Sequence, residues 1–208
     1  MTPRTTRALL AALGLGAALA SLSGAAHGAA DRSVEYQKKL LIGLVDEERG
    51  KVVSSLSTVF DEDALTEIGY KSLRLDTARY KLAPGVRAFG FDLIGRNRHY
   101  CPDGGLGPTR YLYVREGKKI RQIMAEFAVS RWAYIGEDES SCGKIEAPAR
   151  PVENEERSLS VAASRTNGYA DLLVTSTTSV DGKKGVVRTT RIVRYDGDSY
   201  PVNQGSDF

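Results

Sequence analysis

The chain contains few of the residues on which most enzyme and metal chemistry depends. Its 208 residues include two cysteines, two histidines and one tryptophan. His99 is the only histidine after residue 30, so the usual general base is present at one place. The sequence has neither the Gly-x-Ser-x-Gly elbow of serine hydrolases nor the Gly-x-x-x-x-Gly-Lys-Ser/Thr loop that holds phosphates. We therefore expect no cofactor and no metal, and we favour binding over catalysis.

Long apolar runs are absent apart from one near the N-terminus. Two arginines precede an uncharged run from Ala8 to Leu22, an order typical of a secretory signal peptide. The run has about fifteen residues, whereas a membrane-spanning helix needs roughly twenty. The small residue Ala30 suits cleavage after it, with cleavage after Gly28 as an alternative. We expect residues 1–30 to be removed and residues 31–208 to act in the periplasm or outside the cell, with no membrane span.

Neither sign of charge dominates the sequence. Lys and Arg total 29 and Asp and Glu total 26, which gives a net charge of +3. The predicted signal carries two of the arginines and no acid, so its removal brings the charges closer to balance. A mixed-charge surface is a poor match for nucleic acid, and we expect no nucleic-acid partner.

The two cysteines, Cys101 and Cys142, predict one disulfide. An even cysteine count in an oxidising compartment is typical of a structural bridge, and two reduced thiols are the alternative. The bridge would close a loop of about forty residues, for which chain entropy gives on the order of 3–4 kcal/mol of stability. Two sulfurs cannot complete a tetrahedral shell, so the pair does not indicate a metal site.

The residue pattern predicts a mainly β protein, an antiparallel sheet or sandwich, with a small helical N-terminal part. Residues from Ser33 to Glu48 include apolar side chains at helical spacing, and Asp61 begins a second expected helix. Beyond Gly69, alternating apolar and polar runs between Gly, Pro and Asp indicate strands. The predicted strands are 71–80, 87–94, 109–115, 119–125, 131–135, 157–163, 171–176, 186–193 and 199–202. We expect residues 31–208 to form one domain.

Two stretches of the mature chain are similar to each other. Gly90-Phe91-Asp92-Leu93 leads to Asp103-Gly104, and Gly168-Tyr169-Ala170-Asp171-Leu172 leads to Asp181-Gly182. This similarity suggests two related halves, at about 71–140 and 156–204. Unrelated hairpins are the alternative, because Asp-Gly suits any tight turn.

The second half also carries a family resemblance. Asn167-Gly168-Tyr169-Ala170-Asp171-Leu172-Leu173-Val174 is followed by Arg194-Tyr195-Asp196-Gly197-Asp198-Ser199-Tyr200. Residues 164–200 thus resemble the FG-GAP or VCBS-type β repeats of extracellular proteins, which typically bind calcium in an Asp-rich loop. Here Arg165 stands where an acidic ligand is expected. The resemblance implies the turns and strands of such a repeat without its metal.

Basic and aromatic residues gather around the Gly-rich segment 101–108. The arginines would suit an acidic partner, although such a patch is also common on any strand edge, and Tyr and Trp offer large contact areas at recognition surfaces. A place in the core or on a sheet face is the alternative for the aromatic residues. The candidate partner-binding residues are Arg96, Arg98, His99, Tyr100, Arg110, Tyr111 and Trp132.

These observations favour a non-catalytic periplasmic or secreted recognition protein that binds another protein or an envelope component. An inhibitor or immunity protein against a cell-wall-degrading enzyme is one form of this hypothesis. A hydrolase of cell-wall or surface polymer that uses paired carboxylates is an alternative, although no spacing of the acids selects a pair. A structural envelope protein is a third possibility.

Overall fold

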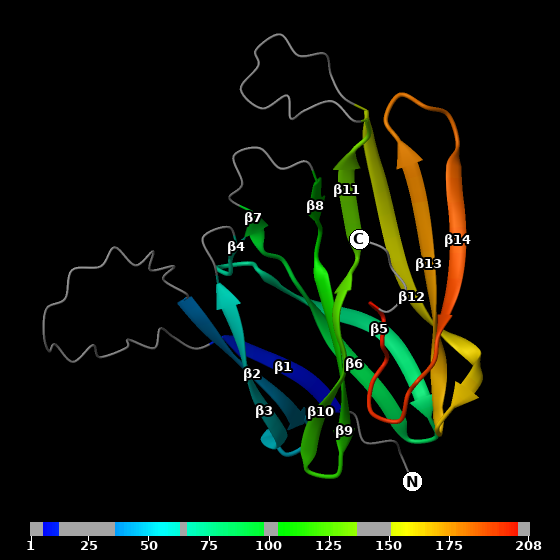
Figure 1. Ribbon diagram of the computed structural model, residues 1–208. Coiled ribbons are helices and arrows are strands. Elements are labelled where there is room, and N and C mark those ends of the chain that lie inside the picture. The colour runs from blue at the N-terminus through cyan, green and yellow to red at the C-terminus, as the bar shows by residue number, and fades with distance from the viewer. Residues whose placement is uncertain (1–5, 13–35, 63–65, 98–103, 137–150, 204–208) are drawn as a thin grey trace, which may run out of the picture. The chain divides into compact units, whose positions relative to one another are not determined.

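A computed structural model of the chain describes residues 6–12, 36–62, 66–97, 104–136 and 151–203. All regular structure within these ranges is β-strand, and all pairings are antiparallel (Figure 1). Within them no helix has the length and apolar character needed to cross a membrane. The described residues form two compact units, one up to Gly69 with Arg96 and Asn97, the other from Tyr70 to Gly95 and from 104 onwards. The predicted mainly β architecture is confirmed.

The first unit is a three-stranded sheet with a short strand pair. The sheet has the order β1-β2-β3, formed by Thr6–Ala12, Tyr36–Asp46 and Lys51–Glu62. The two-residue strands β4 (Thr66–Glu67) and β7 (Arg96–Asn97) form the second pair.

The helical N-terminal part is absent from the described residues. Most of the residues expected to form a helix from Ser33 to Glu48 form strand β2 instead. A second helix was expected to begin at Asp61, and the described residues after Asp61 include strand β4. Leu40, Ile42 and Leu44 are buried, whereas Leu41 between them is 39% exposed. This alternation has the period of a strand, and it outweighs the helical spacing of the same apolar residues.

The second unit contains two antiparallel sheets. The first has the order β10-β9-β6-β5, and the second has the order β14-β13-β12-β11-β8. Their strands are β5 (Leu73–Ala83), β6 (Val86–Leu93), β8 (Gly104–Leu106), β9 (Thr109–Glu116), β10 (Lys119–Ala128), β11 (Ser130–Tyr134), β12 (Val152–Thr166), β13 (Tyr169–Val180) and β14 (Val186–Val193). Eight of the nine predicted strands are thus found, and residues 199–202 are not a strand.

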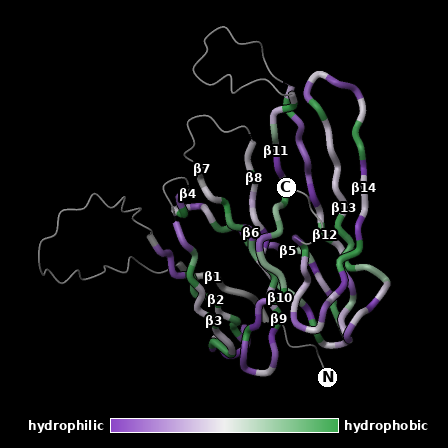
Figure 2. Tube along the Cα trace, viewed as in Figure 1, coloured by the Kyte–Doolittle hydropathy of each residue, from purple (hydrophilic) through white to green (hydrophobic). Residues whose placement is uncertain are grey.

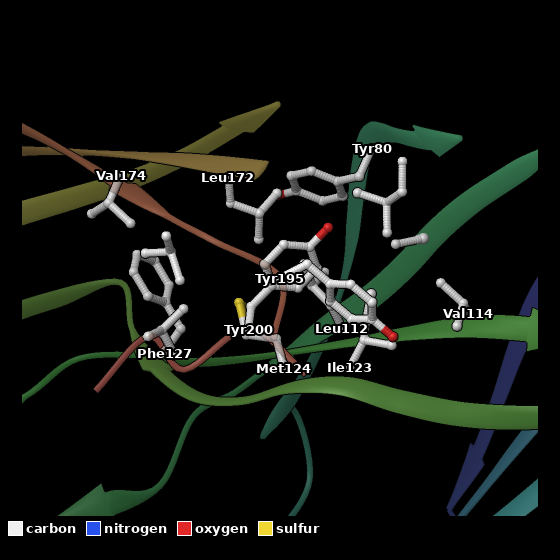
Figure 3. Packing of buried hydrophobic residues seen from close by; sticks show 14 residues of the cluster. Tyr80, Leu112, Val114, Ile123, Met124, Phe127, Leu172, Val174, Tyr195 and Tyr200 are labelled. Carbon is white, nitrogen blue, oxygen red and sulfur yellow. The ribbon is translucent and has the colours of Figure 1, made fainter. Parts of the chain in front are cut away.

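The core of this unit is built from both of its sheets. Figure 3 shows side chains of the four-stranded sheet beside Leu172 and Val174 of β13 and the C-terminal Tyr195 and Tyr200. The buried cluster comprises Tyr80, Leu82, Ala88, Leu112, Val114, Ile123, Met124, Phe127, Leu172, Val174, Val193, Tyr195, Tyr200 and Val202. The backbone N–H of Tyr200 donates to the carbonyl of Ile123 at 2.7 Å, which fixes the C-terminal segment to β10.

The face of the five-stranded sheet that enters the core, here called the inner face, changes character along its strands. On β13, Leu172 and Val174 are buried, and Ser176 follows on the same face two residues later. On β12, Leu159 and Arg157 occupy the neighbouring positions opposite Val174 and Ser176. Figure 2 shows the hydrophilic residues along β12. The inner face therefore continues beyond the apolar core as a polar surface.

Candidate binding site

A pocket of about 220 Å³ lies where the inner face becomes polar. Arg157, Ser176 and Thr189 form one row across β12, β13 and β14, and Val174 opposes Arg191 in the next row. Opposed residues of antiparallel strands point to the same face, so these side chains share one surface. The residues that line the pocket are Arg157, Val174, Ser176, Thr189, Thr190 and Arg191.

The guanidinium of Arg157 is held by a buried carboxylate. Its Nε donates to Oε1 of Glu155 at 2.8 Å, and its Nη2 donates to Oε2 at 2.9 Å. Arg131 donates to the same carboxylate from β11 through its Nε. Two arginines therefore share this carboxylate, and Arg131 also lies 3.9 Å from the carboxylate of Glu153.

The charge of Glu155 is stabilised by these donors. Burial alone would raise the pKa of the Glu155 carboxyl, but hydrogen bonds from Arg157, Ser176 and Arg131 lower it to about 2. Glu155 is 6% exposed and is thus ionised at neutral pH despite its burial. The ionised carboxylate fixes the position of Arg157 in turn.

The second guanidinium of the pocket comes from β14. The Nη2 of Arg191 donates to the carbonyl oxygen of Val202 at 2.7 Å, which connects the strand to the C-terminal segment. From the strand spacing, the Cα atoms of Arg157 and Arg191 lie about 12 Å apart, close enough for two long side chains to contact one small group. No carboxylate lines this pocket in the part of the chain that the structure describes.

This lining matches an anionic group. Guanidinium forks bind carboxylate and phosphate oxygens with paired, charge-assisted hydrogen bonds, and the hydroxyl of Thr189 can add a donor. Among the described residues, no group of three or more His, Cys, Asp and Glu side chains is placed to hold a metal ion. The pocket is therefore suited to recognise a carboxylate or a phosphate.

Arg110, predicted to bind a partner, takes part in a buried ion network instead. Its Nε donates to Oδ1 of Asp92 at 2.7 Å, and its Nη1 donates to the hydroxyl of Tyr80 at 3.1 Å. Arg74 also donates to Asp92, at 2.7 Å. Burial would raise the pKa of Asp92, but the hydrogen bonds from Arg110 and Arg74 hold it below its ordinary range. The side chain of Arg110 is 15% exposed, which leaves it little surface for a partner.

Of the other predicted site residues, the structure describes Tyr111, Trp132 and Arg96. Tyr111 is buried and stacks on Phe91 with ring centroids 5.4 Å apart. Trp132 is half-buried on β11, where it meets Tyr134 edge to face at 5.5 Å. Arg96 belongs to β7 of the first unit. Arg98, His99, Tyr100, Cys101 and Cys142 lie outside the described residues, so the predicted disulfide remains a prediction.

Arg157 and Arg191 are not among the residues predicted from the sequence to bind a partner, although both fall within predicted strands. Their signal is an arginine that replaces an apolar residue in an alternating pattern, at 157 before Leu159 and Val161 and at 191 before Val193. The pattern becomes informative only with the strand register, because register decides which residues share a row.

No protein family, no curated protein and no solved structure matches this chain.

Proposed function

We propose that this chain is a non-catalytic recognition protein that binds a partner or an envelope component through an exposed carboxylate or phosphate group. The pocket between Arg157 and Arg191 carries this proposal. Paired guanidiniums favour such groups over neutral ones because their planar forks match two oxygens at once.

The two arginines have different parts in this proposal. Arg157 is held by two hydrogen bonds to Glu155, so little side-chain freedom is lost when it meets a ligand. Arg191 comes from the neighbouring side of the pocket and adds the second positive charge. A pre-positioned arginine beside a second one favours selective binding of an anion.

The proposed setting is the periplasm or the medium. The N-terminal sequence supports export, because an uncharged run from Ala8 to Leu22 follows two arginines. In that setting we expect Cys101 and Cys142 to be joined. The resemblance of residues 164–200 to extracellular β repeats agrees with this location and implies no bound calcium.

Titration of the mature protein, residues 31–208, with inorganic phosphate and with acetate tests the proposal. Backbone amide shifts in nuclear magnetic resonance spectra should move in a saturable way at Ser176, Thr189 and Arg191. Arg191→Gln should weaken binding about tenfold or more, because a charge-assisted hydrogen bond is lost.

Arg188→Gln is the matched control. Arg188 lies on the same exposed strand as Arg191 but faces the other side of the sheet. Its replacement by glutamine therefore removes the same charge at a position away from the pocket. If both substitutions weaken anion binding equally, the loss comes from the net charge of the protein, and binding at the pocket is refuted. An absence of saturable shifts at the pocket would do the same.

A further inference from the structure

Strand β14 is an open edge of the five-stranded sheet. It pairs with β13 on one side, and the described part of the chain places no strand on its other side (Figure 1). Val186, Val187 and Ile192 are 66%, 64% and 51% exposed. A long edge rich in β-branched residues presents a row of backbone N–H and C=O groups to another strand.

The sequence of β14 is nearly the same read from either end. Val186–Val193 reads Val-Val-Arg-Thr-Thr-Arg-Ile-Val. Two antiparallel copies of one strand run in opposite directions, but the centre of this near-symmetry falls between Thr189 and Thr190 and would set residues of opposite faces against each other, such as Val187 and Ile192. A twofold axis perpendicular to the sheet requires one residue to oppose its own copy, because opposed residues must point to the same face.

An axis at Thr189 gives the better pairing. It sets Val186 opposite Ile192 of the second copy, so two exposed apolar side chains meet on the outer face. It also sets Arg188 opposite Thr190, so no arginine directly opposes an arginine. An axis at Thr190 would set Val186 opposite Arg194 and would leave this apolar pair unformed.

We propose that two copies of this chain pair through β14, centred on Thr189, to form one ten-stranded antiparallel sheet. The contact is the same on both copies and closes on itself, so it stops at a dimer. One strand pair buries little surface, and we expect a dimer that dissociates on dilution.

Pairing also joins the two inner faces. Arg191 then lies opposite Val187 of the second copy, on the same side of the combined sheet as the Arg191 of that copy. Four residues along the strand and one strand spacing separate the two Arg191 Cα atoms by about 14 Å. This part of the inference rests on the proposed function: the paired pockets fit a molecule with two or more anionic groups, whose binding gains from simultaneous contact.

The oligomeric state of the mature protein tests the dimer independently of any ligand. Sedimentation across a concentration series should show a monomer and a dimer in exchange. Val186→Lys should shift the equilibrium to monomer at least tenfold. Val59→Lys, at a position of β3 that is 50% exposed, is the matched control and should leave the equilibrium unchanged.

Cysteine cross-linking tests the register. Opposed residues have Cβ atoms about 4.5–5.5 Å apart, close to the separation that a disulfide needs. After oxidation, Thr189→Cys should therefore form a covalent dimer, whereas Thr177→Cys on the interior strand β13 should not. The parent protein, with its two native cysteines, gives the background level of cross-linking.

A protein that stays monomeric at every concentration overturns the inference. So does a dimer that neither responds to Val186→Lys nor cross-links through position 189, since it uses another surface. We expect the Arg191→Gln variant to form the dimer but to bind phosphate and acetate weakly. The experiments can therefore refute the dimer and the anion-binding pocket separately.

Discussion

Replacing Glu155 with glutamine removes the charge that holds two arginines on the inner face. The pKa of Glu155 falls from its ordinary 4.5 to about 2 in the folded protein. A lowered folded-state pKa adds stability that is fully present above pH 4.5 and is lost as pH falls toward 2. At 1.36 kcal/mol for each pKa unit, the ionised carboxylate contributes on the order of 3 kcal/mol at neutral pH.

Urea denaturation of the parent and of Glu155→Gln at pH 7 and at pH 3 measures this contribution. We expect the substitution to cost about 3 kcal/mol at pH 7 and clearly less at pH 3, where the parent has lost part of the same stability. Glu153→Gln is the control, because the Glu153 carboxylate is 38% exposed and lies 3.9 Å from Arg131. Its cost should stay below about 1 kcal/mol.

The pH dependence of this cost tests whether ionisation of Glu155 stabilises the fold. A cost of Glu155→Gln that is the same at both pH values would refute the argument that ionisation of this carboxylate stabilises the fold. A cost equal to that of Glu153→Gln would show that burial and the two arginine contacts add nothing.

Two further changes test the second unit. Asp92→Asn should cost about 3–5 kcal/mol in urea denaturation, because it leaves Arg110 buried without its main counter-charge, whereas Asp198→Asn, at a side chain that is 90% exposed, should cost less than about 1 kcal/mol. Gly90→Ala should lower the thermal midpoint, because a Cβ there would lie 2.2 Å from the Tyr111 carbonyl oxygen and force a shift that costs about 1–3 kcal/mol. Gly69→Ala meets nothing within 4 Å and should change little; equal effects of the two alanines would contradict the steric argument.

The strands of the second unit could be predicted because their pattern is local. Alternation of apolar and polar residues between turn residues marks each strand without knowledge of its partners, as in 186–193, whose predicted and observed bounds agree. The short strand β8, Gly104–Leu106, could not be found this way. Its glycines do not contribute to an alternation of apolar and polar residues, and the strand is defined by its pairing with Arg131–Ala133 of β11.

The first unit shows where local pattern fails. Leu40, Leu41 and Leu44 fit a helical face, while Leu40, Ile42 and Leu44 fit a strand face equally well. The pairing of β2 with β3 decides between them, because the buried set is the second one. Sequence alone did not provide that pairing.

The candidate site depended on register in the same way. Arg110 was predicted to face a partner because basic residues cluster near it in sequence. Its neighbours across the sheet include Asp92, directly opposite on β6, which pairs with its charge inside the unit. Arg157 and Arg191 lie 34 positions apart and come together only through the pairing of β12, β13 and β14.

If residues 1–30 are removed on export, as we propose, the loss of strand β1 gives the first unit two different forms. Its seven residues, Thr6–Ala12, pair with residues 40–46 of β2 and lie wholly inside the segment that we expect to be cleaved. Cleavage after Ala30 would uncover the backbone N–H and C=O groups on that side of β2, turning an interior strand into an edge. The leader would then serve as a temporary cover for β2, and the moment of its removal would determine when that edge first becomes available for pairing.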